Sequence, residues 1–402
     1  MKLETTWERD GTDFPAVRGA LQRLEGSLGG PPDIVFFFGA ESCNPRGIAE
    51  MLSVRWPQAR VHGGSSCMGV MTRERFEAHP QSFGLLGIVD PRGAYGVGSV
   101  ELGADPRHDV QRALTLALEQ ADRPGEVPAM VLLTSPPGQE EELLLGIAEV
   151  LGPAVPVAGG SAGDDAVSGK WWQAANRSVG HQLVVVTVLF PSGSVVSSFQ
   201  SGYEVTALSA RVTRATGRNL HEIDGRPAAT VYNEWTVGAI ADIVKRGGKV
   251  LQKTSALHPL GRSAGASGDV VEFLLSFIDT VLEDGTITLF TEVKEGEQLW
   301  LMRGTDESLV ERAARIARVS LDGLVQERGA DRVIGALVVF CAACAVYIRE
   351  RMPEVVERLD KALGSRPYLG TFTFGEQGCF LAGGNRHGNM MVTVILFVDQ
   401  DS

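Results

Sequence analysis

Residues 33–66, DIVFFFGAESCNPRGIAEMLSVRWPQARVHGGSS, contain the pattern that decides the fold. The apolar run 33–39 predicts a buried strand, and the apolar side chains of residues 45–56 have helical spacing. Residues 59–62 predict a second strand, which leads into Gly63-Gly64-Ser65-Ser66. A strand, a helix and a second strand in this order form a right-handed crossover, so the sequence predicts a β-α-β unit.

The same pattern returns twice along the chain. In the second copy, Val131 and Gly159 are separated by 28 positions, as are Val35 and Gly63 in the first copy. The third copy is looser, and its segments are a strand at 335–341, a helix at 353–363 and a glycine turn at 370–376. One more apolar strand follows each copy, at 83–89, 183–190 and 391–397. Continuous apolar runs of this kind are typical of strands that are covered on both faces. The sequence therefore predicts an α/β fold in which repeated β-α-β units form mixed, largely buried sheets with internal pseudo-symmetry.

A different region, from about residue 199 to residue 330, separates the second and third copies. Its predicted elements are strands at 202–205, 211–216, 287–291 and 298–302, an amphipathic stretch at 228–244 and a helix at 309–327. We expect three parts in the chain: an N-terminal extension with a helix at 1–30, one domain at 31–197 and a second domain at 198–398.

Composition excludes several classes of protein. The chain of 402 residues has 37 Lys and Arg against 49 Asp and Glu, a net charge of −12, which disfavours a nucleic-acid partner. The longest uncharged apolar window, 333–348, is shorter than the ~20 residues that cross a bilayer, so we expect a buried strand and a turn there, and no membrane insertion. The charged N-terminus and the five cysteines predict a cytoplasmic protein with reduced thiols.

Five motifs in order resemble a known family. They are GGSSCMG at 63–69, VAGGSAGDD at 157–165, EIDGRPA at 222–228, HPLG at 258–261 and GTFTFGE at 370–376. Together they resemble the signatures of FIST proteins, named for F-box and intracellular signal transduction, over about residues 33–397. The resemblance implies an N-terminal and a C-terminal FIST domain packed together. It also implies a sensor that binds small molecules such as amino acids and passes its state to a signalling partner.

The two domains fill the length, so the partner that the resemblance implies is a separate protein such as a kinase or another effector. Two departures from the family pattern lie near the C-terminus. The chain has Cys341-Ala342-Ala343-Cys344 where the family usually has a Cys followed three residues later by Arg. The usual His-Asn pair is spread out as His387-Gly388-Asn389.

The sequence predicts a polar ligand, an amino-acid-like metabolite, in a cleft between the two halves. Backbone amides at glycine turns can bind a carboxylate, side-chain carboxylates accept an ammonium group, and a guanidinium pairs with a carboxylate. The candidates for these roles are the turn residues Gly63, Gly64, Ser65, Ser66, Gly159, Gly160 and Ser161, the acids Asp164, Asp165 and Glu376, and Arg262, His387 and Asn389. The structural alternatives are plain tight turns, helix caps, a solvated arginine and a neutral core histidine.

Two other functions stay open. A haem-dependent sensor of nitric oxide or another gas, which the resemblance also implies, would use His387, Cys341 or Cys344 as a ligand. A cysteine-dependent enzyme is the second alternative. Neither a nucleotide-binding glycine fingerprint nor a Gly-x-Ser-x-Gly nucleophile motif occurs at the strand ends, and no other metal site is indicated. The sequence therefore favours a protein that is not an enzyme and that requires no cofactor.

Overall fold

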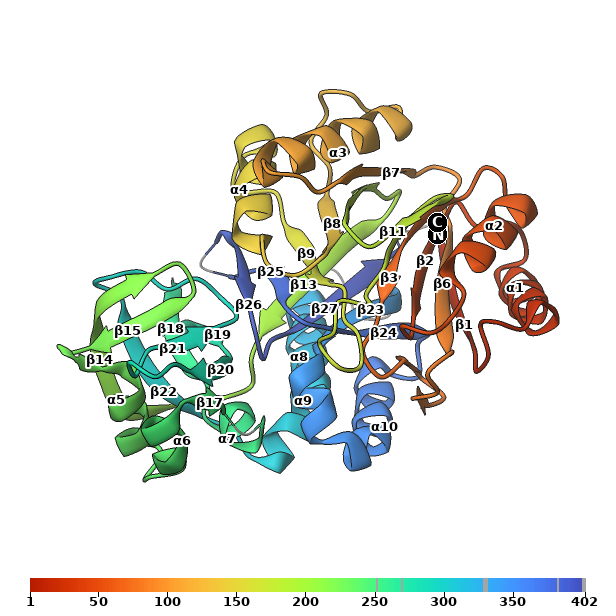
Figure 1. The fold of residues 1–402 in the computed structure, drawn as a ribbon. Coiled ribbons are helices and arrows are strands. Elements are labelled where there is room, and N and C mark those ends of the chain that lie inside the picture. The colour runs from red at the N-terminus through yellow and green to blue at the C-terminus, as the bar shows by residue number, and fades with distance from the viewer. Residues whose placement is uncertain (251, 269, 328–331, 382, 400–402) are drawn as a thin grey trace.

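The structure is a computed structural model that describes residues 1–250, 252–268, 270–327, 332–381 and 383–399. Three units with the same order of elements form the body of the molecule (Figure 1). Each unit consists of a strand, a helix, a strand, helical residues, a strand, a hairpin and a final strand. The predicted mixed α/β class is confirmed, and the repeat is longer than the β-α-β core that the sequence showed.

The first two units follow each other without interruption. The elements of the first are β1 (Lys2–Glu8), α1 (Phe14–Leu28), β2 (Ile34–Gly39), α2 (Pro45–Arg55), β3 (Arg60–Ser65), β4 (Val70–Thr72), β5 (Phe76–Glu77) and β6 (Phe83–Val89). Those of the second are β7 (Ala94–Glu101), α3 (Pro106–Gln120), β8 (Met130–Ser135), α4 (Glu140–Leu151), β9 (Val157–Ser161), β10 (Gln173–Ala175), β11 (Ser178–Gly180) and β12 (Leu183–Phe190). In both units the two predicted crossover strands are parallel, and the final strand returns antiparallel to the first of them.

The third unit is interrupted after its first strand. It consists of β13 (Ser194–Gln200), α8 (Asp306–Glu327), β23 (Val333–Cys341), α9 (Ala342–Tyr347), a 3-10 turn (Arg349–Arg351), α10 (Met352–Leu363), β24 (Tyr368–Thr373), β25 (Glu376–Cys379), β26 (Asn385–Gly388) and β27 (Val392–Val398). Strands β23 and β24 are parallel, as in the other units. The buried strand predicted in the window 333–348 is confirmed as β23, but the predicted turn is wrong, because the chain enters the short helix α9 directly after Cys341.

The hairpins are exchanged cyclically among the three sheets. Hairpin β10–β11 of the second unit pairs with β3 of the first, β25–β26 of the third pairs with β9 of the second, and β4–β5 of the first pairs with β24 of the third. Each sheet therefore has six strands in the same order, and each contains strands of two units. The exchange closes a ring, so none of the three units is complete without the other two.

Alternate residues of the central strands face two different cores. Phe36 and Phe38 of β2 belong to a cluster with Leu132 of β8 and Leu337 of β23, so the inner faces of the three sheets meet. The neighbouring residue Phe37 faces outward and packs with the helices of its own unit. This two-sided burial is the physical reason for the continuous apolar runs in the sequence.

The inserted region forms a nine-stranded sheet with a core of its own. Its elements are β14 (Glu204–Thr216), β15 (Asn219–Ile223), β16 (Arg226–Pro227), α5 (Ala228–Trp235), α6 (Ala241–Arg246), β17 (Gly248–Lys249), α7 (Gln252–Leu257), β18 (Leu260–Ser267), β19 (Val270–Ser276), β20 (Ile278–Val281), β21 (Ile287–Leu289) and β22 (Gln298–Arg303). Two predictions differ from these bounds. The strands expected at 202–205 and 211–216 are one long strand, and the amphipathic stretch 228–244 is two short helices separated by residues with positive φ, Val237 and Gly238.

Figure 1 shows the inserted region on the opposite side of the molecule from the first unit, with α8, α9 and α10 in the lower middle of the view, between the two. The two ends of the chain lie together, and the N-terminal ammonium group of Met1 is 3.0 Å from a carboxylate oxygen of Asp399. Among the described residues, the helices are all too short or too polar to cross a membrane.

Candidate functional site

The Gly-Gly-Ser segments lie inside strands, so the prediction that they form turns is wrong. Residues Gly63, Gly64 and Ser65 are the end of β3, and the second set, 159–161, is the end of β9. A Cβ atom on Gly63 would lie 2.1 Å from the carbonyl oxygen of Phe37 on the neighbouring parallel strand. At the equivalent Gly159 it would lie 1.9 Å from the carbonyl oxygen of Leu133. The glycines are required because these strands approach closely, which is a structural reason for the motif.

The amides and hydroxyls of these segments already have partners. The N–H of Ser65 donates to the carbonyl of Trp172, and the N–H of Ser161 donates to the carbonyl of Gly375, both at 2.8 Å. The hydroxyl of Ser65 accepts the N–H of Trp172, and that of Ser161 donates to Glu140 at 2.6 Å. The hydroxyl of Ser66 accepts the N–H of Phe372. In this structure these residues join the exchanged hairpins to the sheets.

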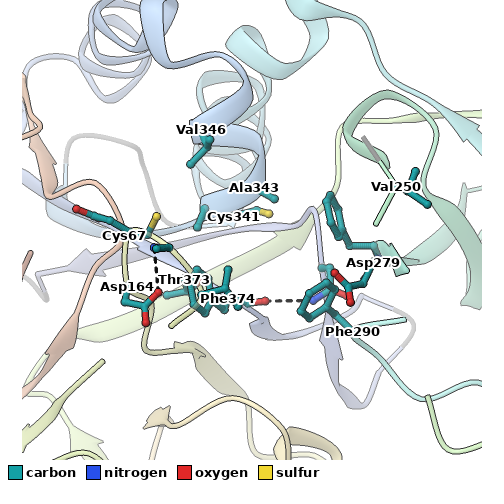
Figure 2. A pocket seen from close by; sticks show the side chains of 16 residues that line it. Cys67, Asp164, Val250, Asp279, Phe290, Cys341, Ala343, Val346, Thr373 and Phe374 are labelled. Atoms are coloured by element: carbon teal, nitrogen blue, oxygen red, sulfur yellow. Dashed lines mark hydrogen bonds between the residues drawn. The ribbon is translucent and has the colours of Figure 1, made fainter. Parts of the chain in front are cut away.

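The main pocket, of about 310 Å³, lies where strands β3, β9, β23 and β24 end and the inserted region covers them. Figure 2 shows Asp164, Thr373 and Cys67 on one side of it and Asp279, Phe290 and Val250 on the other, with Cys341 and α9 above. The full lining is Cys67, Asp164, Asp165, Ala166, Val167, Val250, Phe277, Asp279, Phe290, Cys341, Ala342, Ala343, Val346, Thr373, Phe374 and Asn389. Three of the predicted ligand residues are brought together here, Asp164, Asp165 and Asn389.

The carboxylates of the pocket differ in how much of their bonding capacity is used. Asp164 is buried and accepts the backbone N–H groups of Ala166, Ser168 and Lys170, so it holds the loop that follows β9. Burial would raise the pKa of Asp164, but these hydrogen bonds lower it. Asp165 is exposed, and only its Oδ1 atom has a bond shown among the described residues, from the N–H of Met68 at 2.6 Å. Its second oxygen can accept a ligand donor.

Across the pocket, Asp279 lies beside two aromatic rings. Its Oδ2 atom accepts the hydroxyl of the neighbouring Thr280 at 2.9 Å. The rings of Phe277 and Phe290 lie 5.6 Å apart between centroids. Asn389 ties these elements together, because it accepts the N–H of Phe277 and donates to the carbonyl of Phe374. The lining that the structure describes includes no Lys, Arg or His, so the pocket offers negative charge and apolar surface.

Cys341 is on the pocket wall and Cys344 lies behind it. Cys341 is 3% exposed, whereas Cys344 is fully buried and contacts the hydroxyl of Tyr203 at 3.4 Å. Burial by itself would raise the pKa of Cys344, but hydrogen bonds from Cys341 and Tyr203 and the positive charge of Arg312 lower it to about 7. Burial raises the pKa of Cys341 well above its usual value. Cys344 is therefore the more acidic thiol of the pair.

Glu376 does not line the pocket. Its side chain is fully buried, accepts the hydroxyl of Thr373 at 2.9 Å and accepts the N–H of Met391 at 3.1 Å. Burial, together with the nearby Cys341, raises the pKa of Glu376 well above its usual value. An enclosed carboxyl group with a raised pKa is poorly suited to pair with an ammonium ligand in the way that the sequence suggested.

Arg262 and His387 line a second pocket, of about 540 Å³, between α4 and the inserted region. The guanidinium of Arg262 is buried and donates to the hydroxyls of Ser276 and Thr291 and to the carbonyl of Glu292, and it forms an ion pair with Glu297 at 3.3 Å. Of the guanidinium nitrogens, only the buried Nε has no hydrogen-bond partner among the described residues. The predicted carboxylate-binding arginine is thus separated from the predicted ammonium-binding acids.

Next to this second pocket, Glu140, Glu141 and His387 form a cluster that offers three ligand atoms within 4.8 Å of one another. Arg218 already bridges both carboxylates, with Nη2 at 2.6 Å from Glu140 and 2.8 Å from Glu141. His387 Nδ1 lies 3.0 Å from Glu141. Burial would raise the pKa values of both glutamates, but the neighbouring His387 and Arg218 lower them. The donor set fits an ion-pair network better than a cation site, because the guanidinium supplies the positive charge.

The three residues named as possible haem ligands are not brought to one pocket. Cys341 lines the main pocket, His387 lines the second, and Cys344 is enclosed behind Cys341. His387 Nδ1 is already bonded to a carboxylate. Several residues of the main pocket escaped sequence reasoning, among them Asp279, Phe277, Phe290 and Cys67. Only Cys67 carried a signal, as part of the motif 63–69, because the others follow ordinary strand patterns.

Comparisons with known proteins give two matching family models. The model described as the FIST N domain matches residues 33–226, and the FIST C domain model matches residues 228–379. An uncharacterized protein of Methanocaldococcus jannaschii is 30% identical over 179 residues, which are 42% of this chain and 33% of that protein. The chain thus spans about a third of the length of that curated relative. A solved structure of cyanuric acid hydrolase from A. caulinodans aligns over 99% of both chains, with 9% identity and a TM-score of 0.36, and this likeness supports no inference.

Proposed function

This chain belongs to the FIST family, whose domains are sensor domains of signal transduction, and from that premise we propose that it senses a small organic amine bound in the main pocket. The ligand that the pocket suits has a protonated amine and a compact apolar or aromatic body. Two observations carry the proposal. Asp165 and Asp279 each have one carboxylate oxygen with no hydrogen bond shown among the described residues. The aromatic rings of Phe277 and Phe290 line the same cavity.

The chemistry of the lining supports an amine rather than a complete amino acid. A protonated amine gains charge-assisted hydrogen bonds from carboxylates, and aromatic faces attract cations. A ligand carboxylate would meet Asp164, Asp165 and Asp279 without a compensating cation, since Arg262 is engaged in the second pocket. Of the two charged groups of the expected amino-acid-like ligand, we therefore propose that the pocket recognises only the ammonium group.

The position of the pocket supports a sensor role. Cys67 and residues 164–167 belong to the part matched by the FIST N model, whereas Phe277, Asp279 and Phe290 belong to the part matched by the FIST C model. An occupant that contacts both sides binds best when they are closed on it, so binding shifts the population of their arrangements. We propose that a separate signalling protein reads this change by contact.

The test compares three probes that share an aromatic ring and differ in charge: phenethylamine, phenylalanine and 3-phenylpropionate. We expect isothermal titration calorimetry on the full chain to show binding of the amine, weaker binding of the amino acid and none of the acid. Equal or tighter binding of 3-phenylpropionate would refute the proposed charge preference.

A variant series locates the site. Asp165→Asn keeps an oxygen for the N–H of Met68 but removes the charge, so we expect affinity for phenethylamine to fall by about tenfold or more, the effect of losing one charge-assisted hydrogen bond. Asp279→Asn is expected to act similarly. Asp322→Asn, an exposed aspartate on α8, is the matched control and is expected to bind like the natural protein.

A further inference from the structure

We propose that Cys341 and Cys344 are a redox-active dithiol, which closes to a disulfide when a small hydroperoxide enters the main pocket. The proposal concerns a covalent site in the wall of the pocket and does not depend on the nature of the reversible ligand. It rests on the placement of the two thiols, on the route to them and on the charge that surrounds them.

The two sulfur atoms share one small space. Cys341 is the last residue of β23, and Cys344 lies in the first turn of α9, so the pair spans a strand-to-helix junction. Each thiol shifts the pKa of the other. Both also contact the sulfur of Met390, at 3.8 Å from Cys341 and 3.7 Å from Cys344. A Cys-x-x-Cys pair next to a β-α-β unit is an arrangement that supports dithiol chemistry.

The pocket provides the route for an oxidant. Cys341 lines it, together with Ala342 and Ala343, whereas Cys344 is covered completely by its neighbours. A molecule the size of hydrogen peroxide can therefore reach Cys341, and Cys344 is placed to complete a disulfide from behind.

A buried guanidinium provides the charge that a reactive thiol needs. Arg312 is fully buried, and it lies over the ring of Phe340 at 4.2 Å. Its Nη1 donates to the carbonyl of Met390 at 3.0 Å, but its Nε and Nη2 have no hydrogen-bond partner among the described residues. Such a cation is costly unless a negative group lies nearby. Burial would lower the pKa of Arg312, but the nearby Cys344, Tyr203, Cys341 and Glu376 raise it, and Cys344 has the largest of these opposing effects.

The reaction balances as two steps. The sulfur of Cys341 attacks the outer oxygen of the hydroperoxide ROOH while its proton passes to the thiolate of Cys344, so the O–O bond breaks and RO⁻ leaves. Cys341 is then a sulfenic acid, and RO⁻ takes a proton from solvent to give ROH. Next, Cys344 attacks the sulfur of the sulfenic acid, the S–O bond breaks, and the hydroxide leaves as water with the proton of Cys344. The two sulfurs lose two electrons, and the peroxide oxygens gain them.

The test is the mass of one peptide. Trypsin cleaves after Arg332 and Arg349, so residues 333–349 carry both cysteines and no cleavage site between them. The full-length protein is treated with hydrogen peroxide, denatured, alkylated with iodoacetamide and digested. We expect this peptide to take up no alkyl group and to be lighter by two hydrogen atoms, and dithiothreitol treatment before alkylation to restore two alkyl groups.

Variants separate the pair from the other thiols. Cys341→Ser is expected to leave Cys344 open to alkylation after peroxide, since it removes the thiol that faces the pocket. Cys379→Ser changes a thiol outside the pocket lining and is expected to leave the peptide result unchanged. In Arg312→Lys the charge is kept, and we expect faster disulfide formation than in Arg312→Met.

Two results would overturn the proposal: a peptide that takes up two alkyl groups after peroxide treatment, or a peptide cross-linked to Cys67 instead. The mixture contains no amine, so failure of phenethylamine to bind leaves the dithiol result unaffected. A negative peptide result likewise leaves the amine titration unaffected.

Discussion

The hydroxyl oxygen of Ser66 accepts a hydrogen bond of 2.8 Å from the backbone N–H of Phe372, 306 residues further along the chain. The same hydroxyl donates to the carbonyl of Gly69. Ser66 directly follows β3 of the first unit and thus joins that unit to β24 of the third, the strand with which hairpin β4–β5 pairs. The motif suggested that Ser66 contacts a ligand, but its hydroxyl connects two units of the fold. This structural role can be tested by substitution.

We expect Ser66→Ala to lower the free energy of unfolding by about 1–3 kcal/mol, because it leaves the buried N–H of Phe372 without an acceptor. Chemical denaturation measures this loss. Thr115→Ala is the control: Thr115 is exposed and bonds only within helix α3, so a change under about 0.5 kcal/mol is expected. Equal stability of Ser66→Ala and the natural protein would show that the joint contributes nothing.

Two glycine-to-alanine changes should have opposite signs. Gly63→Ala places a Cβ atom 2.1 Å from a backbone oxygen of Phe37, and this clash cannot be relieved by a side-chain rotation. We expect a loss of roughly 3 kcal/mol or more, or no folded protein. Gly26 is exposed on helix α1 and no atom lies close to its missing Cβ, so Gly26→Ala should stabilise by about 0.5–1 kcal/mol. Thermal denaturation of both variants measures these changes in stability. A Gly63→Ala variant as stable as the natural protein would contradict the role of Gly63 in strand packing.

Glu376→Gln should become increasingly favourable as the pH rises. Burial raises the pKa of Glu376 in the folded protein, so above about pH 4.5 the unfolded chain loses this proton while the folded protein keeps it. The stability of the natural protein therefore falls with pH by about 1.4 kcal/mol per pH unit for this one group, until the folded group also ionises. Glutamine has no such proton. We expect the free energy of unfolding of the variant, measured from pH 4 to pH 8, to rise relative to that of the natural protein. A difference that is constant across this range would mean that Glu376 is ionised in the folded protein.

The Arg218 ion pairs should have the opposite pH dependence. His387 and Arg218 lower the pKa values of Glu140 and Glu141 despite burial, so their stabilising contribution is present above about pH 4.5 and is lost as the pH falls below it. We expect Arg218→Met to cost about 3 kcal/mol at pH 7, because it removes the guanidinium that bridges the two carboxylates, and less at pH 3.5.

Arg107→Met is the control for this change. Arg107 pairs with Glu142 and Glu149 on the surface, where an ion pair contributes about 1 kcal/mol or less. Urea denaturation of both variants at the two pH values gives the comparison. A cost for Arg218→Met that is the same at pH 7 and pH 3.5 would show that the carboxylates keep their charge for another reason.

The candidate site was predictable only in part, and particular residues show why. Asp164 and Asp165 follow a strand that local patterning identifies, so their place at a sheet edge could be expected. The other wall of the pocket could not be predicted, because Asp279 and Phe290 belong to ordinary strands of the inserted region. Arg262 was assigned to the ligand on chemistry alone, and its four polar partners became visible only when the sheet that surrounds it was formed.

By itself the sequence determined the three β-α-β units, the two-sided burial of their strands and the FIST resemblance, because hydrophobic periodicity and motif order are local properties of the chain. Tertiary structure alone decided the exchange of hairpins, since an apolar strand can pair with any free sheet edge and only the closed ring selects one. It also decided that the Gly-Gly-Ser segments are tightly packed strands. The pocket follows from that ring, which brings the ends of strands from three units beneath one inserted sheet.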